Sequence, residues 1–94
     1  MSVLVKFVGS LRHFSSVSSI KVSLNGSRTL WNVIDDLEAQ IPALKGAIID
    51  KRLGYQKTNA LILVNDREIS VLKGLETALE NGDEVVFIPV VHGG

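Results

Sequence analysis

The sequence predicts an α+β fold, in which a mixed sheet of four to five strands is covered on one face by one main helix. Two patterns carry this prediction. Apolar residues alternate with a period of two near both ends of the chain, as in strands that bury one face. From Thr29 the apolar period becomes that of an α-helix. Ninety-four residues allow one hydrophobic core, so we expect one domain over residues 1–91 and a short tail over residues 92–94.

Two strands are predicted in the N-terminal part of the chain. Val3, Val5 and Phe7 alternate with their neighbours, which indicates a first strand with one buried face. After a serine-rich connection at residues 15–19, the alternation returns at residues 20–24. We expect this second strand to end in a turn, because an asparagine-glycine pair follows it.

The main helix is predicted from one apolar stripe with helical spacing, formed by Leu30, Val33, Ile34, Leu37 and Ile41. Thr29 has a hydroxyl that can cap the first turn, and Pro42 is expected to end the helix. The acidic side chains on the other faces are expected in solvent: Asp35, Asp36 and Glu38. Residues 43–49 are expected to add a shorter helical turn.

The next predicted strand is apolar without interruption. Residues 50–59 are polar and indicate a loop, and residues 60–64 then form an apolar run typical of a strand buried on both faces. Asn65-Asp66 is expected to turn the chain into a short strand at residues 67–69.

A final strand is predicted at residues 85–91, after a short helical turn at residues 75–79. If Val85 and Phe87 point into the core, alternate residues point the other way. The single helix can cover only one face of the sheet, so an apolar patch is expected on the uncovered face, including Val86, Ile88 and Val90.

Composition excludes several classes of function. Ten basic and ten acidic residues give a formal net charge of zero, and no aromatic residues interleave the basic ones, so we expect neither direct nucleic-acid binding nor membrane binding. The chain has no cysteine, which is compatible with the cytoplasm, where we expect it. His13 and His92 lie at opposite ends without ligand spacing, so no metal site is expected. No set of polar residues suggests a catalytic centre, and we expect a protein that is not itself an enzyme.

The C-terminal residues are the remaining candidate for function. His92, Gly93 and Gly94 follow the last predicted strand directly. Glycine lacks a Cβ atom, so a Gly-Gly tail is thin enough to enter a narrow channel and present a carboxylate to a partner enzyme. The alternative is an end of the chain that merely frays.

The last third of the chain resembles the MoaD, ThiS and ubiquitin-related-modifier superfamily of sulfur carriers and protein modifiers. Residues 79–89, LENGDEVVFIP, are similar to the family's L-x-x-G-D-E-V-x-F-x-P run, which precedes a closing Gly-Gly. The likeness extends to the first strand with its following Leu11-Arg12 and to the strand ending at Val64-Asn65. Val90 departs from the second proline of the MoaD ending PPVxGG, and His92 is more like the modifier branch. The resemblance implies a ubiquitin-like β-grasp fold.

The resemblance also implies how the tail is used. An activating enzyme would adenylate the Gly94 carboxylate with ATP, and a sulfur donor would convert it to a thiocarboxylate, with no cofactor bound to the chain itself. Two fates stay open. One is sulfur transfer, to a small molecule through a molybdopterin synthase large subunit in molybdenum cofactor biosynthesis, or to tRNA through a tRNA thiolation enzyme. The other is conjugation to lysines of target proteins.

A partner-binding face follows from the same resemblance. Val8, Ile69 and Ile88 match positions of the MoaD-like apolar face, and the alternation of the last strand adds Val86 and Val90. Arg12 is a candidate for a polar contact at the rim. The competing hypothesis is a non-covalent β-grasp binding module, in which this face acts alone and the tail has no chemical role.

Overall fold

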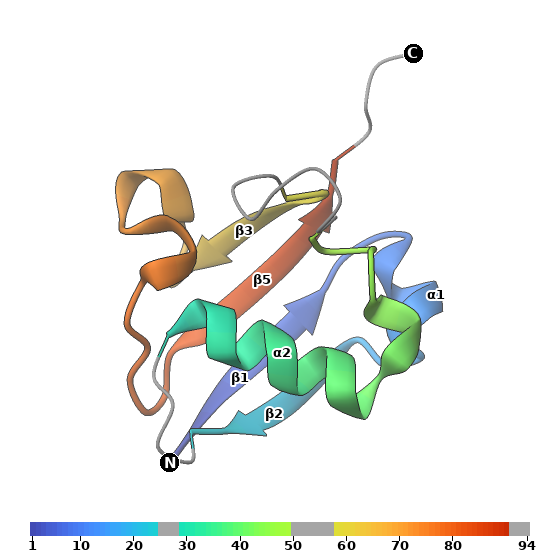
Figure 1. Ribbon diagram of the computed structural model, residues 1–94, viewed down its shortest axis with the longest axis horizontal. Helices are drawn as coiled ribbons and strands as arrows, with labels where there is room; N and C mark the ends of the chain where they lie inside the picture. The colour runs from blue at the N-terminus through green and yellow to red at the C-terminus, as the bar shows by residue number, and fades with distance from the viewer. Residues whose placement is uncertain (25–28, 50–57, 91–94) are drawn as a thin grey trace.

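The computed structural model describes residues 1–24, 29–49 and 58–90, and shows a five-stranded sheet in the order β2-β1-β5-β3-β4 (Figure 1). The strands are β1 (Ser2–Phe7), β2 (Ser19–Ser23), β3 (Ala60–Val64), β4 (Arg67–Glu68) and β5 (Glu84–Pro89). The last strand in the chain, β5, lies in the middle of the sheet, parallel to β1 and antiparallel to β3. The sheet is therefore mixed, as the sequence predicts.

One long helix, α2 (Leu30–Gln40), crosses one face of the sheet (Figure 1). It begins at Thr29, whose hydroxyl accepts a hydrogen bond from the Asn32 backbone N–H at 3.2 Å, while the Asn32 side chain accepts from the Thr29 backbone N–H. Its last residue is Gln40, and the C-cap Ile41 comes immediately before Pro42. The predicted stripe is confirmed, because the residues that α2 buries against the sheet include Leu30, Val33, Ile34 and Leu37.

The core fills the space between α2 and the sheet. Val3, Val5 and Phe7 of β1 are at most 1% exposed, and Val85 and Phe87 of β5 are fully buried. The rings of Phe7 and Phe87, which are partners in the parallel register, stack with their centroids 5.9 Å apart. The predicted division of β5 into core residues and outward residues is confirmed.

Short helices make up much of the rest of the described chain. These are α1 (Leu11–Ser15) and the 3-10 helices η1 (Pro42–Leu44), η3 (Ile69–Val71) and η4 (Gly74–Glu76). The helix α1 was not predicted, and β4 is only two residues long where three were expected. The predicted turn between β3 and β4 is confirmed, with Asn65 and Asp66 at φ values of 50° and 69°. The predicted turn at residues 25–26 and most of the predicted loop at residues 50–59 lie outside the described residues.

Two burial predictions were wrong. The strand β3 is buried on one face only: Leu61 is 38% exposed and Leu63 is half-buried, because no element of the described residues forms a second layer on that side of the sheet. Glu38 was expected in solvent but is 5% exposed, because it follows the buried Ile34 by one helical turn and shares its side of α2. Asp35 and Asp36 are exposed as predicted.

Candidate functional site

The end of β5 is held on both sides by neighbouring strands, close to the C-terminal tail. The Val8 N–H donates to the Phe87 carbonyl at 3.1 Å, and the Val90 N–H donates to the Asn59 carbonyl at 3.3 Å. Asn59 is itself fixed, since its side-chain amide donates to the Gly46 carbonyl at 2.9 Å. The backbone is therefore anchored up to Val90, the last described residue. The tail residues predicted to act, His92, Gly93 and Gly94, lie outside the described residues.

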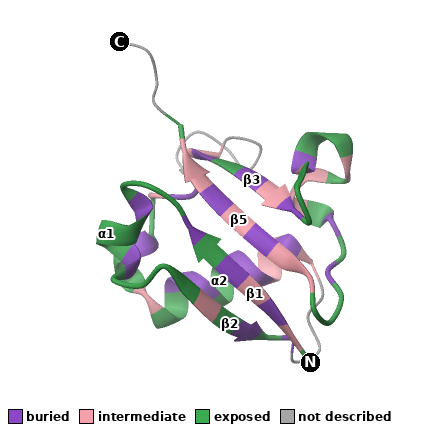
Figure 2. Cartoon of the chain, turned by 180° about the vertical axis from the view of Figure 1, so that it is seen from behind, coloured by how far each residue is buried: buried purple, intermediate pink, exposed green. Residues whose placement is uncertain are grey.

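The uncovered side of the sheet carries an apolar surface, which we call the open face: Val8, Leu61, Leu63, Val86, Ile88 and Val90. In the register, Leu61 is opposite Ile88 and Leu63 is opposite Val86. Figure 2 shows this side, where buried residues alternate with half-buried ones along β5 and with half-buried or exposed ones along β3. Val8 and Val90, at the ends of β1 and β5, are 39% and 42% exposed. The structure thus brings four predicted partner-binding residues, Val8, Val86, Ile88 and Val90, to one side of the sheet.

Leu61 and Leu63 belong to the open face but were missed in the sequence. Their run was interpreted as a strand buried on both faces. Alternation along the strand could have identified them, because successive side chains point to opposite faces of a sheet. The core residues of β3 are Ala60, Ile62 and Val64, and Leu61 and Leu63 lie between them.

Ile69 does not lie on the open face, where the sequence placed it. It is 8% exposed and packs in the core. The strand β4 ends at Glu68, and Ile69 begins the 3-10 helix η3, so strand alternation no longer decides where its side chain points. It borders a groove on the other side of the sheet, together with Trp31 of α2.

Arg12 lies on α1, next to the end of β1. Its side chain is exposed, and its Nε donates to the Phe7 carbonyl at 3.2 Å. This bond fixes the base of the guanidinium group near the end of β5, because Phe7 pairs with Phe87. Its contact with a partner stays a prediction.

The open face changes from apolar to charged along β5. Lys6 of β1 and Glu84 of β5 form an exposed ion pair at 3.2 Å, on the side of the sheet that also carries Val86. Such a pair contributes at most about 1 kcal/mol, so its main effect is to place charges at the border of the apolar surface.

The described residues offer little for chemistry of their own. Across residues 1–24, 29–49 and 58–90, no group of three or more His, Cys, Asp or Glu side chains is arranged to hold a metal ion. In the same part of the chain, no helix has the length and apolar character needed to cross a membrane.

A mixed five-stranded sheet with one covering helix and a central C-terminal strand defines the class of small ubiquitin-like β-grasp proteins. Comparison with known proteins narrows this class. The chain belongs to the ThiS family, whose model matches residues 5–94. The resemblance seen in the sequence, and the fold that it implies, are both confirmed.

Individual relatives include both carriers and modifiers. The chain is 33% identical over 94 residues to small archaeal modifier protein 3 of Haloferax volcanii, covering 100% of both chains. It is 38% identical over 74 residues to the sulfur carrier protein CysO of Mycobacterium tuberculosis, covering 78% of each. Among solved structures, the crystal structure of the Amycolatopsis orientalis BexX/CysO complex contains a chain that matches with a TM-score of 0.79 and 25% identity, covering 98% of this chain and 99% of that one. Proteins of this family are small carriers and modifiers rather than catalysts.

Proposed function

We propose that this protein is a sulfur carrier whose Gly94 carboxylate is adenylated by a partner enzyme and then converted to a thiocarboxylate. One observation carries the proposal: a ThiS-family chain has its central strand anchored through Val90, a few residues before Gly94. A rigid platform next to a thin glycine tail suits a protein that delivers its carboxyl group into the site of another protein.

The proposed chemistry needs no catalytic group from the chain. A Gly94 carboxylate oxygen attacks the α-phosphorus of ATP, pyrophosphate leaves, and a mixed anhydride with AMP forms. Hydrosulfide released by the donor then attacks the acyl carbon, AMP leaves, the S–H proton is lost to solvent, and the chain ends in a thiocarboxylate. Adenylation is required because a free carboxylate is a poor electrophile with no good leaving group. Because activation consumes ATP, we place this chemistry in the cytoplasm.

The open face is the proposed docking surface for the activating enzyme. It is apolar at its centre and charged at the Lys6–Glu84 end, which matches the apolar core and polar rim of protein interfaces. Its two outermost members, Val8 and Val90, adjoin the point where the tail leaves the sheet. The CysO relative that was crystallised as a complex with BexX supports docking of this fold onto a second protein.

Activation is the step that both fates share. A thiocarboxylate can release its sulfur to a small-molecule acceptor on a molybdopterin synthase large subunit or to tRNA on a thiolation enzyme. If a lysine amine attacks the activated carbonyl instead, an isopeptide bond forms and the chain becomes a protein modifier. Relatives named as carriers and as modifiers support the shared step equally.

Pyrophosphate exchange tests the activation step. With the adenylating enzyme of the same organism, the chain is expected to stimulate incorporation of labelled pyrophosphate into ATP. Deleting Gly94, or adding one residue after it, is expected to abolish exchange without unfolding the domain. Exchange that persists in both variants would contradict activation at Gly94.

A non-covalent binding module is the second candidate, favoured by the apolar open face. The same variants separate the two. A binding module would keep its partner affinity and its cellular function when a residue is added after Gly94, whereas a carrier would lose its function.

A further inference from the structure

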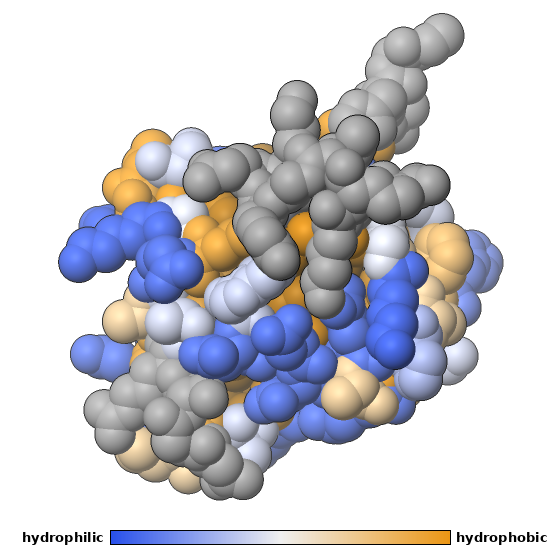
Figure 3. All heavy atoms as spheres, in the orientation of Figure 1, coloured by the Kyte–Doolittle hydropathy of each residue, from blue (hydrophilic) through white to orange (hydrophobic). Residues whose placement is uncertain are grey.

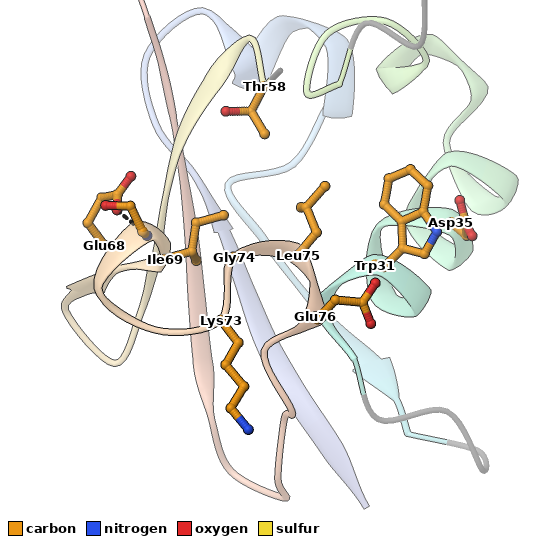
Figure 4. A pocket seen from close by; sticks show the side chains of 10 residues that line it. Trp31, Asp35, Thr58, Glu68, Ile69, Lys73, Gly74, Leu75 and Glu76 are labelled. Atoms are coloured by element: carbon orange, nitrogen blue, oxygen red, sulfur yellow. Dashed lines mark hydrogen bonds between the residues drawn. The ribbon is translucent and has the colours of Figure 1, made fainter. Parts of the chain in front are cut away.

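A groove lies on the helix-covered side of the molecule, between the first turns of α2 and the 3-10 helices η3 and η4 (Figure 4). Its volume is about 850 Å³. Ile69 and Leu75 project into it from one side, and the Trp31 indole lies on the other (Figure 4). Figure 3 shows apolar atoms at the surface beside α2, bordered by hydrophilic ones. The groove thus has an apolar floor and an aromatic wall.

The rim of the groove is acidic around the tryptophan. Asp35 follows Trp31 by one helical turn and therefore shares its side of α2. Glu76 reaches toward the indole from η4, so carboxylates flank Trp31 from two elements (Figure 4). Both Asp35 and Glu76 are exposed. Lys73 also borders the groove, but its side chain extends away from Trp31 (Figure 4).

We propose that this groove binds a basic peptide segment of a partner protein, with an arginine over Trp31 and an aliphatic side chain over Ile69 and Leu75. A guanidinium stacked on an indole gains a cation–π interaction, and carboxylates on both sides complement its charge. An apolar floor accepts the aliphatic neighbour. An acidic rim repels phosphate, which excludes nucleic acid as the occupant.

The position of the groove gives the site a distinct role. It is on the α2 side of the sheet, whereas the open face is on the opposite side (Figures 1 and 2). A protein bound in the groove would therefore leave the open face accessible. The inference goes beyond the proposed function and does not depend on activation of Gly94.

Trp31 is the single tryptophan of the chain and provides the readout. We would titrate the protein with a capped synthetic peptide of alternating leucine and arginine, and follow the indole emission. Saturable change is expected, and it is expected to weaken as salt is raised. A peptide with glutamine in place of arginine is expected to give no saturable change over the same concentrations. Equal binding of the two peptides would overturn the proposal.

A matched pair of variants tests the rim. Asp35→Asn is expected to weaken peptide binding by roughly two- to fivefold, and adding Glu76→Gln to weaken it further, as for exposed charge pairs. Asp36→Asn removes the same charge from the next residue of α2, which does not border the groove, and is expected to have no more than the small effect of net charge. Equal effects of Asp35→Asn and Asp36→Asn would overturn the assignment. The proposal would also be overturned if spermidine reproduced the whole change in indole emission, because the groove would then bind cations without recognising a peptide.

Discussion

Gly9 and Pro89 lie against each other where β1 turns into α1 beside the end of β5. A Cβ atom added at Gly9 would lie 3.3 Å from Pro89 Cγ, and Gly9 has a φ of +61°. Glycine is therefore favoured at this position both by the left-handed backbone conformation and by the small space beside Pro89. This contact sets how closely the β1–α1 connection approaches the strand that carries the tail.

Gly9→Ala is expected to destabilise the fold more than a glycine substitution that meets only backbone strain. The left-handed conformation alone costs a non-glycine residue about 1–2 kcal/mol. Gly74 has a similar φ of +57° but nothing within 4 Å of an added Cβ atom, so Gly74→Ala measures that cost by itself. Denaturant unfolding is expected to show a larger loss for Gly9→Ala, by on the order of 1 kcal/mol. If the two variants lose the same free energy of unfolding, Pro89 moves away from the added Cβ atom at no energetic cost.

The reciprocal cap of α2 gives a second prediction. Thr29→Ala removes the acceptor for the Asn32 N–H and is expected to lower the free energy of unfolding by about 1 kcal/mol. Thr29→Ser keeps a hydroxyl in the same position and is expected to retain most of that stability. If the alanine and serine variants unfold at the same denaturant concentration, the cap does not stabilise the helix.

Glu68 gives a prediction about pH. Hydrogen bonds from Ser70, first from its side chain and then from its backbone N–H, lower the pKa of the Glu68 carboxyl below its ordinary value. Because the pKa is lower in the folded state, the interaction stabilises the fold at pH values above the pKa that Glu68 has in the unfolded chain. This contribution is lost as the pH falls through the folded pKa. NMR titration is expected to give a midpoint below that of an ordinary glutamate, and Ser70→Ala to raise it. An unchanged midpoint in the variant would exclude the Ser70 side chain as the main cause and leave only its backbone N–H.

The open face is tested by adding a charge at two places. Ile88→Glu is expected to weaken binding of the activating enzyme by about 2 kcal/mol or more if Ile88 lies at the interface centre, because a carboxylate would be buried without a partner. Gln40→Glu adds the same charge at the exposed end of α2, on the other side of the sheet, and is expected to change binding little. Isothermal titration calorimetry gives both affinities, and circular dichroism checks that the variants are folded. Equal affinities would remove the open face from the interface.

The sequence predicts most of the fold because periodicity reports burial directly. The stripe of α2 and the alternation of β5 each have one buried side, so the pattern identifies both the element and the side that Ile88 occupies. The run in β3 is apolar throughout, so it has no polar side to mark the exposed face. Whether Leu61 is exposed depends on whether a second layer packs on the sheet, and this is a property of the tertiary structure. Ile69 was misplaced because β4 ends one residue earlier than expected. The five-residue helix α1 is too short to leave a periodic signal.

The groove could not be predicted either, because its sides come from distant parts of the chain. Trp31 and Asp35 are one helical turn apart, which the spacing suggests, but Leu75 and Glu76 meet them only through the packing of η4 against α2. Trp31 is half-buried and packs against the core, while it also borders the groove.

The mass of the intact chain tests the central claim most directly. The purified protein would be incubated with its adenylating enzyme, ATP and a sulfur donor, and measured by mass spectrometry. We expect a product heavier by the difference between a sulfur and an oxygen atom, and fragmentation that locates the change at Gly94. A chain whose mass never changes, and which never becomes linked to a lysine, would contradict the account.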